Sequence, residues 1–146
     1  MRKIEMQKLV TLYYEYQDWG KVRRICLQDN VLQQRTDRSS KLLYAELVSR
    51  LKFLEPEALS HAHSCSMQDR EMLFWLATCR RYDFIYDFAI EVLREHVLMM
   101  DMKIQYYDFN SFWNTKALQD DHLNNIADST KFGLYFYYKA ENGYFA

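Results

Sequence analysis

Glycine and proline are scarce in this chain, and their scarcity restricts the folds that are open to it. The 146 residues include three glycines and one proline. Sheets joined by tight turns usually need more of both, because these residues fit turn conformations that others adopt less readily. Apolar residues make up 49% and charged residues 27%, which is a globular and not a disordered composition. The sequence therefore predicts helices with short connections.

Hydrophobic residues recur at helical spacing along nearly the whole chain. Two helix starts carry capping signals: Asp18 precedes one periodic segment, and Ser66 with Asp69 resembles a capping box before another. The predicted fold is all-α, a compact domain of about seven to eight helices. The expected helices are 2–16, 19–28, 37–54, a short one beginning at Pro56, 67–81, 82–100, 107–118 and a segment capped at Asp128. Three of them have a predicted core face, which includes Ile4, Leu9, Leu12, Tyr13 and Tyr16 on 2–16, Leu43, Leu47, Leu51 and Leu54 on 37–54, and Val97 on 82–100. Arg38, Lys41, Ser49 and Lys52 are expected on the side of 37–54 opposite its leucines.

Charge is distributed unevenly along the chain. Residues 1–52 hold eleven Lys or Arg against six Asp or Glu, whereas residues 53–146 hold eight against fourteen. The net charge of −1 therefore describes a bipolar molecule, and it excludes a uniformly basic nucleic-acid binder or a uniformly acidic mimic. The expected organisation is a single helical domain over 1–131, with a basic half 1–55 and an acidic half 56–131, followed by an aromatic tail over 132–146.

Recognisable catalytic and metal-binding patterns are missing. The sequence has no GxSxG, HExxH, Walker-type or GxGxxG motif. His61, His63 and Cys65 come nearest to a metal cluster, but His63 would point away from the other two on a helix. Cys79 lies in the middle of an apolar helix, a poor place for a thiolate nucleophile. We expect no enzymatic activity, no catalytic residue, no metal and no cofactor.

The cellular compartment is indicated by the cysteines and the hydropathy. Three cysteines without a CxxC pair do not resemble a disulfide framework. No signal peptide follows the basic N-terminal residues, and no apolar run approaches the roughly 18–20 residues that span a bilayer. The sequence predicts a cytoplasmic protein that makes no membrane contact.

The basic stretch 21–52 is the strongest indication of function. It contains eight basic residues against three acidic ones, on two expected helices whose connector of some seven residues is longer than in a standard helix-turn-helix. Such residues could neutralise phosphates and gain affinity by counterion release, although an ordinary solvated helix face would look similar. The candidate DNA-binding residues of this helix-turn-helix-like N-terminal half are Lys21, Arg24, Arg35, Arg38, Lys41 and Lys52.

Several short motifs follow one another over about residues 4–131. They are Asp18-Trp19-x-x-Val22-Arg23, Asp29-Asn30-Val31-Leu32-Gln33-x-Arg35-Thr36, Leu47-x-x-Arg50-Leu51, Leu73-x-Trp75-Leu76-Ala77-x-Cys79-Arg80-Arg81-Tyr82, Asp108-Phe109-x-x-Phe112-x-x-Lys116-Ala117 and Ser129-Thr130-Lys131. In order and spacing the chain resembles the BrxA family of the BREX phage-defence systems. The resemblance implies an all-helical, cytoplasmic, non-enzymatic protein that binds double-stranded DNA and works beside the methyltransferase and ATPase components of BREX.

Beyond Lys131 the chain departs from the resemblance. Family members continue with a basic, leucine-rich helix, where this sequence has the aromatic residues of 132–146. We therefore expect a C-terminus that is truncated or altered. The aromatic rings of this tail are expected either to fold back into a groove of their own chain or to enter the groove of a second copy. The second arrangement is a homodimer through the tail.

Three functions are compatible with these observations. The leading hypothesis is a DNA-binding accessory protein of a BREX phage-defence system that contacts the phosphate backbone. The alternative is a helical scaffold that binds other defence proteins through its acidic half and aromatic tail. RNA binding shares the basic stretch and is not separated from DNA binding by the sequence.

Overall fold

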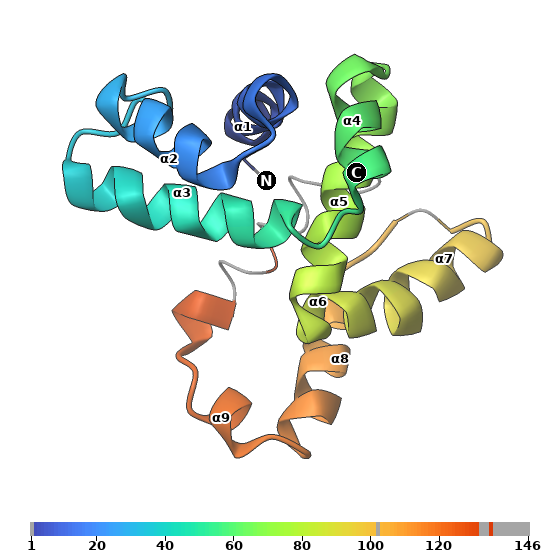
Figure 1. The fold of residues 1–146 in the computed structure, drawn as a ribbon. Helices are drawn as coiled ribbons and strands as arrows, with labels where there is room; N and C mark the ends of the chain where they lie inside the picture. The colour runs from blue at the N-terminus through green and yellow to red at the C-terminus, as the bar shows by residue number, and fades with distance from the viewer. Residues whose placement is uncertain (1, 102, 132–134, 136–146) are drawn as a thin grey trace. The chain divides into compact units, whose positions relative to one another are not determined.

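Regular structure in the computed structural model is helical wherever the chain is described, which is over residues 2–101, 103–131 and 135 (Figure 1). No strand occurs in these residues, so the all-α prediction is confirmed. The helices are α1 (Lys3–Tyr16), α2 (Trp19–Gln28), α3 (Asp37–Leu51), α4 (Pro56–Ser64), α5 (Met67–Arg81), α6 (Asp83–Phe88), the π-helical η1 (Ala89–Leu93), α7 (Arg94–Leu98), α8 (Tyr106–Ala117) and α9 (Asp121–Asn124). The expected tail, and the homodimer through it, lie outside the described residues except for Tyr135.

The helix starts follow the local capping chemistry. Asp18 accepts a hydrogen bond from the backbone N–H of Gly20 and begins α2. Ser66 accepts one from the backbone N–H of Asp69 and begins α5, while Pro56 is the first residue of α4. These three starts agree with the prediction. The expected helix 82–100 is instead three consecutive segments, α6, η1 and α7, because the backbone passes through a π-helical stretch.

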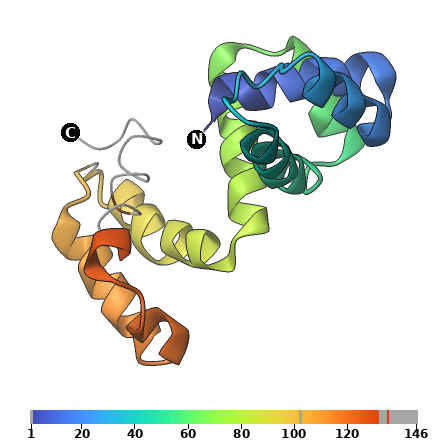
Figure 2. The same cartoon turned by 90° about the vertical axis from the view of Figure 1, so that its left-hand side faces the viewer.

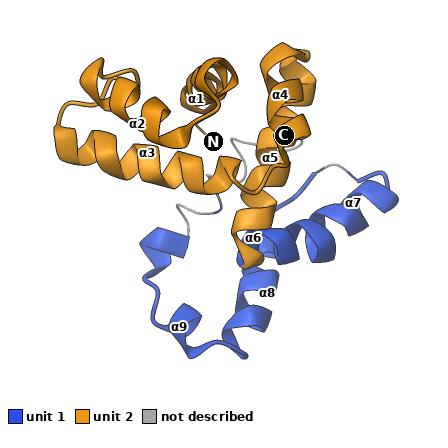
Figure 3. Cartoon of the chain, viewed as in Figure 1, with its two compact units in different colours: residues 1, 84–146 blue, residues 2–83 orange. Residues whose placement is uncertain are grey.

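The chain divides into two compact units, Arg2–Asp83 and Phe84–Ala146, of which the second also includes Met1 (Figure 3). This division lies at Asp83, and the boundary between the expected basic and acidic halves lies at 55/56. The single domain expected over 1–131 stays a prediction.

None of the helices in the described part of the chain combines the length and hydropathy that a membrane-spanning helix needs.

In the N-terminal unit, α1 packs against α2, α3 and α4, and α3 also packs against α5 (Figures 1 and 2). The predicted apolar stripe of α3 is buried, with Leu47 and Leu51 fully inaccessible. The face expected for α1 is partly wrong: Ile4 is 70% exposed. The fully buried side of α1 consists of Met6, Leu9 and Val10, whose i, i+3 and i+4 spacing makes one face of a helix.

In the C-terminal unit, aromatic rings join α6 to α8. Phe88 meets Phe109 and Phe112 edge to face, with ring centroids 5.6 and 5.2 Å apart. Tyr135 is buried and packs against Phe109 at 5.7 Å. Val97 was expected in this core but is 55% exposed, and α7 has no buried residue.

Candidate nucleic-acid interface

All six cations predicted to bind DNA lie on the surface of the N-terminal unit. Each side chain is exposed, and none of the six forms an ion pair with a described acidic residue. They are distributed over α2 (Lys21 and Arg24), the connector (Arg35), α3 (Arg38 and Lys41) and the turn after α3 (Lys52). Their charges are therefore available to a ligand, because no carboxylate of the unit neutralises them directly.

Two of these cations lie on one face of α3, and Lys52, the residue that follows the helix, continues the same face. Arg38 and Lys41 are three residues apart, and Lys52 follows Lys41 by eleven residues, which is close to three turns at 3.6 residues per turn. Leu47 and Leu51 lie on the opposite, buried side of the same helix. The sequence predicted this separation of faces, and the structure brings the three cations onto a common exposed stripe.

The pair on α2 is exposed because the opposite side of the helix is in the core. Val22 and Cys26 are fully buried, whereas Lys21 extends over the Tyr16 ring, with its Nζ 4.4 Å from the ring centroid. The Tyr44 hydroxyl of α3 donates a hydrogen bond of 2.8 Å to the Trp19 carbonyl at the start of α2. Since α2 and α3 also pack together, this bond sets the position of one basic helix against the other.

The connector that carries Arg35 is ordered by its own hydrogen bonds. Asn30 has a positive φ of 43°, and its side chain both accepts from the backbone N–H of Gln34 and donates to the Gln34 carbonyl. Lys8 of α1 donates to the Val31 carbonyl at 2.9 Å. These contacts lead the chain to Thr36, whose capping box with Ser39 begins α3. Arg35 therefore precedes a fixed helix start.

The helix–connector–helix geometry differs from a standard helix-turn-helix in one respect. The connector, residues 29–36, has eight residues, against 3–4 in the standard motif. The helix-turn-helix likeness of this half stays a prediction.

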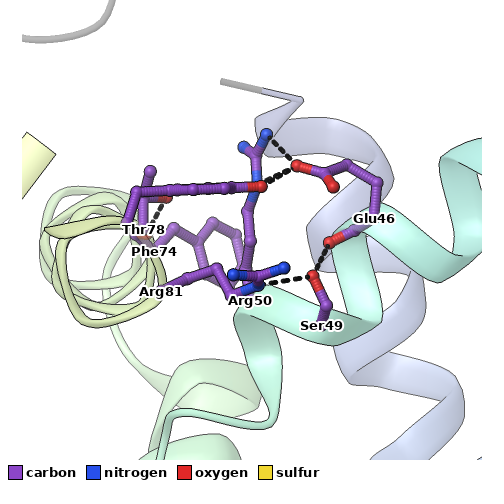
Figure 4. Close-up of polar contacts among 7 residues, drawn as sticks. Glu46, Ser49, Arg50, Phe74, Thr78 and Arg81 are labelled. Atoms are coloured by element: carbon purple, nitrogen blue, oxygen red, sulfur yellow. Dashed lines mark hydrogen bonds and ion pairs between the residues drawn. The ribbon is translucent and has the colours of Figure 1, made fainter. Parts of the chain in front are cut away.

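Two further arginines at the end of α5 contact α3 and the turn that follows it, and the prediction did not include them. Arg80 donates to the Phe53 carbonyl at 3.1 Å. Arg81 donates through Nε to the Ser49 hydroxyl at 3.3 Å (Figure 4). Both side chains are exposed. Two consecutive arginines at the end of an expected helix were the available sequence signal. Their proximity to α3 depends on tertiary packing, which spacing along the chain does not show.

A nearby arginine is neutralised within the protein. Arg50 donates through Nε and Nη2 to one Glu46 carboxylate oxygen, at 3.2 and 2.8 Å. The Tyr82 hydroxyl donates to the same oxygen. Burial raises the pKa of Glu46, but the hydrogen bonds from Tyr82 and Arg50 and the charges of Arg50 and Arg81 outweigh it, so the pKa lies below its ordinary value. The bond between Tyr82 and Glu46 holds α3 to the residue that follows α5.

The BrxA family model matches residues 2–135 of this chain. The chain belongs to the BrxA family. Membership makes it a BREX-associated protein. The match spans all six predicted cations as well as Arg80 and Arg81. No curated protein and no solved structure matches the chain.

The side chains considered for catalysis or metal binding have other surroundings in this BrxA-family chain. Burial raises the pKa of the Cys79 thiol to about 11, so the thiol is protonated at neutral pH. The His63 ring stacks on Tyr14 with centroids 4.1 Å apart. Among the residues that the structure describes, no three His, Cys, Asp or Glu side chains are grouped so that they could hold a metal ion.

Proposed function

We propose that this BrxA-family chain is a non-enzymatic DNA-binding accessory protein of a BREX phage-defence system. It contacts the phosphate backbone of double-stranded DNA through the exposed cations of α2, the connector and α3. The observation that carries the proposal is that all six predicted cations are exposed and without an acidic partner among the described residues.

The chemistry of these residues fits a polyanion. A cation that is already paired releases little free energy on meeting a phosphate, whereas an unpaired exposed cation can displace the counterions condensed on DNA. Contacts of this kind are to phosphate and do not depend on base sequence.

The methyltransferase and ATPase components of BREX are the protein partners in this proposal. One observation favours the alternative, a scaffold that binds such proteins without touching nucleic acid. Consecutive apolar side chains at the end of α7 are exposed, from 55% at Val97 to 90% at Met100. Exposed apolar groups that follow one another are typical of protein–protein contacts.

A salt titration separates the two functions. Binding to a duplex DNA of mixed sequence, measured by fluorescence anisotropy between about 50 and 200 mM salt, should weaken by a factor on the order of 10³–10⁵ if six or more phosphates are neutralised. An RNA duplex of the same length, run in parallel, tests the choice of DNA over RNA. Binding that does not respond to salt, or its absence at low salt, would contradict the DNA proposal and favour the scaffold.

A further inference from the structure

We propose that Arg81 forms a phosphodiester-binding position on the exposed face of α3, held in place by Ser49 and Tyr82. The inference rests on the proposed DNA-binding function and extends the interface beyond the stretch 21–52 to a residue of another helix. The ligand class is the backbone phosphate of duplex DNA.

The guanidinium of Arg81 is oriented by two contacts, of which Figure 4 shows the bond to Ser49. Its Nε donates to the Ser49 hydroxyl, and its central carbon lies 5.0 Å from the centroid of the Tyr82 ring. The Ser49 hydroxyl itself donates to the Glu46 carbonyl at 2.7 Å, so its oxygen is left with a lone pair for Arg81. Because the side chain is already positioned, less conformational entropy is lost when it binds an anion.

The two terminal nitrogens of Arg81 make no hydrogen bond or ion pair with any residue that the structure describes. The planar guanidinium can therefore donate from both nitrogens to two oxygens of one phosphate. Arg50 differs in this respect, because its Nε and Nη2 both bind the Glu46 carboxylate. Glu46 thus accepts hydrogen bonds from Arg50 and feels the charge of Arg81 without bonding to it, so the terminal nitrogens of Arg81 are still available to a ligand.

The acceptor of Arg81 lies on the same side of α3 as the predicted cations. Ser49 follows Arg38 by eleven residues, close to three helical turns, and precedes Lys52 by three residues. Arg81 therefore joins the stripe of α3 at its C-terminal end, near Lys52. Arg80, bonded to the Phe53 carbonyl, holds the end of α5 beside the same turn.

The salt dependence of duplex binding counts neutralised phosphates, so it tests the position directly. Arg81→Gln should reduce the slope of log K against log salt by about 0.9, which makes the loss of affinity between 50 and 200 mM about 3.5-fold smaller than in the wild type. Arg94→Gln is the matched control, since Arg94 is also exposed and has no partner among the described residues. It should leave the slope unchanged.

Two conservative variants distinguish a ligand from a structural arginine. Arg81→Lys and Ser49→Ala keep the charge but lose the Nε contact, so both should weaken binding and retain the wild-type slope. An unchanged slope in Arg81→Gln, with wild-type protein that does bind, would overturn the position alone. Wild-type protein that fails to bind at all would overturn the proposed function. If Arg81→Gln fails to fold by circular dichroism, wild-type affinity in both Arg81→Lys and Ser49→Ala would overturn the proposal.

Discussion

Neutralising two cations of α3 should change the salt dependence of DNA binding without changing the fold. Arg38 and Lys41 are exposed and make no ion pair with a described residue, so replacing both with glutamine removes two charges and no internal contact. Glutamine has nearly the same helix propensity as lysine and arginine. The free energy of unfolding should therefore stay within about 0.5 kcal/mol of the wild type for each substitution.

The effect on binding follows from the number of phosphates that the protein neutralises, because each one releases condensed counterions. If all six predicted cations contact phosphate, the slope of log K against log salt is about −5.4, and affinity falls about 1,800-fold between 50 and 200 mM. Removing two contacts leaves a slope of about −3.6 and a loss of about 150-fold. Fluorescence anisotropy with a labelled duplex measures both curves.

The control variant removes the same two charges from the C-terminal unit. Arg94→Gln with Lys103→Gln also removes one arginine and one lysine, both exposed and in the C-terminal unit. Its slope should equal that of the wild type. Equal slopes for the α3 double variant and the wild type, or equal reductions in both double variants, would refute the assignment of phosphate contacts to this face.

Three further predictions concern the stability of the N-terminal unit. Leu47→Ala, at a fully buried position, should lower the free energy of unfolding by about 2–5 kcal/mol in urea denaturation, and a cost below about 1 kcal/mol would contradict the burial. Asn30→Ala should cost roughly 1–3 kcal/mol, because alanine keeps the unfavourable positive φ and loses the bonds to Gln34; an unchanged melting temperature would show that the connector does not need them. The carboxylate of Glu46 has a lowered pKa in the folded state, so its stabilising contribution is present above its unfolded pKa of 4.5 and is lost as pH falls through the folded value. The melting temperatures of wild type and Glu46→Gln should therefore converge on acidification, and divergence would contradict the sign of the shift.

Local chemistry made several parts of this fold predictable. The starts of α2, α4 and α5 depend on Asp18, Pro56 and Ser66, each of which acts within a few residues of its own position. The buried stripe of α3 was predictable because Tyr44, Leu47 and Leu51 recur at helical spacing, whereas the burial of Ser40 on the same side was not. The exposed stripe that carries Arg38 and Lys41 follows from the same periodicity.

The errors have a common physical cause, which is that neighbouring elements decide between similar local patterns. Ile4 and Met6 are both apolar and near the start of α1, but the packing of α1 buries Met6 and leaves Ile4 exposed. The π-helical stretch at Ala89–Leu93 shifts the register of the expected helix 82–100, and periodicity at 3.6 residues does not reveal it. Arg81 was missed because its partner, Ser49, is 32 residues away in sequence.

Three arginines of the N-terminal unit show why a count of basic residues does not define a binding surface. Arg70 donates to three carbonyl oxygens at the end of α4, and Arg50 donates to the carboxylate of Glu46. Both would lose internal bonds if they turned to a ligand, and each broken bond of a charged group costs about 1.5–3 kcal/mol. Arg81 can bind an anion while keeping its contact with Ser49, because the terminal nitrogens are not used by that contact. The charge that is available for DNA therefore depends on which arginines the fold has already paired. Within the N-terminal unit this criterion admits Arg81, which lies outside the stretch 21–52, and excludes Arg50, which lies inside it.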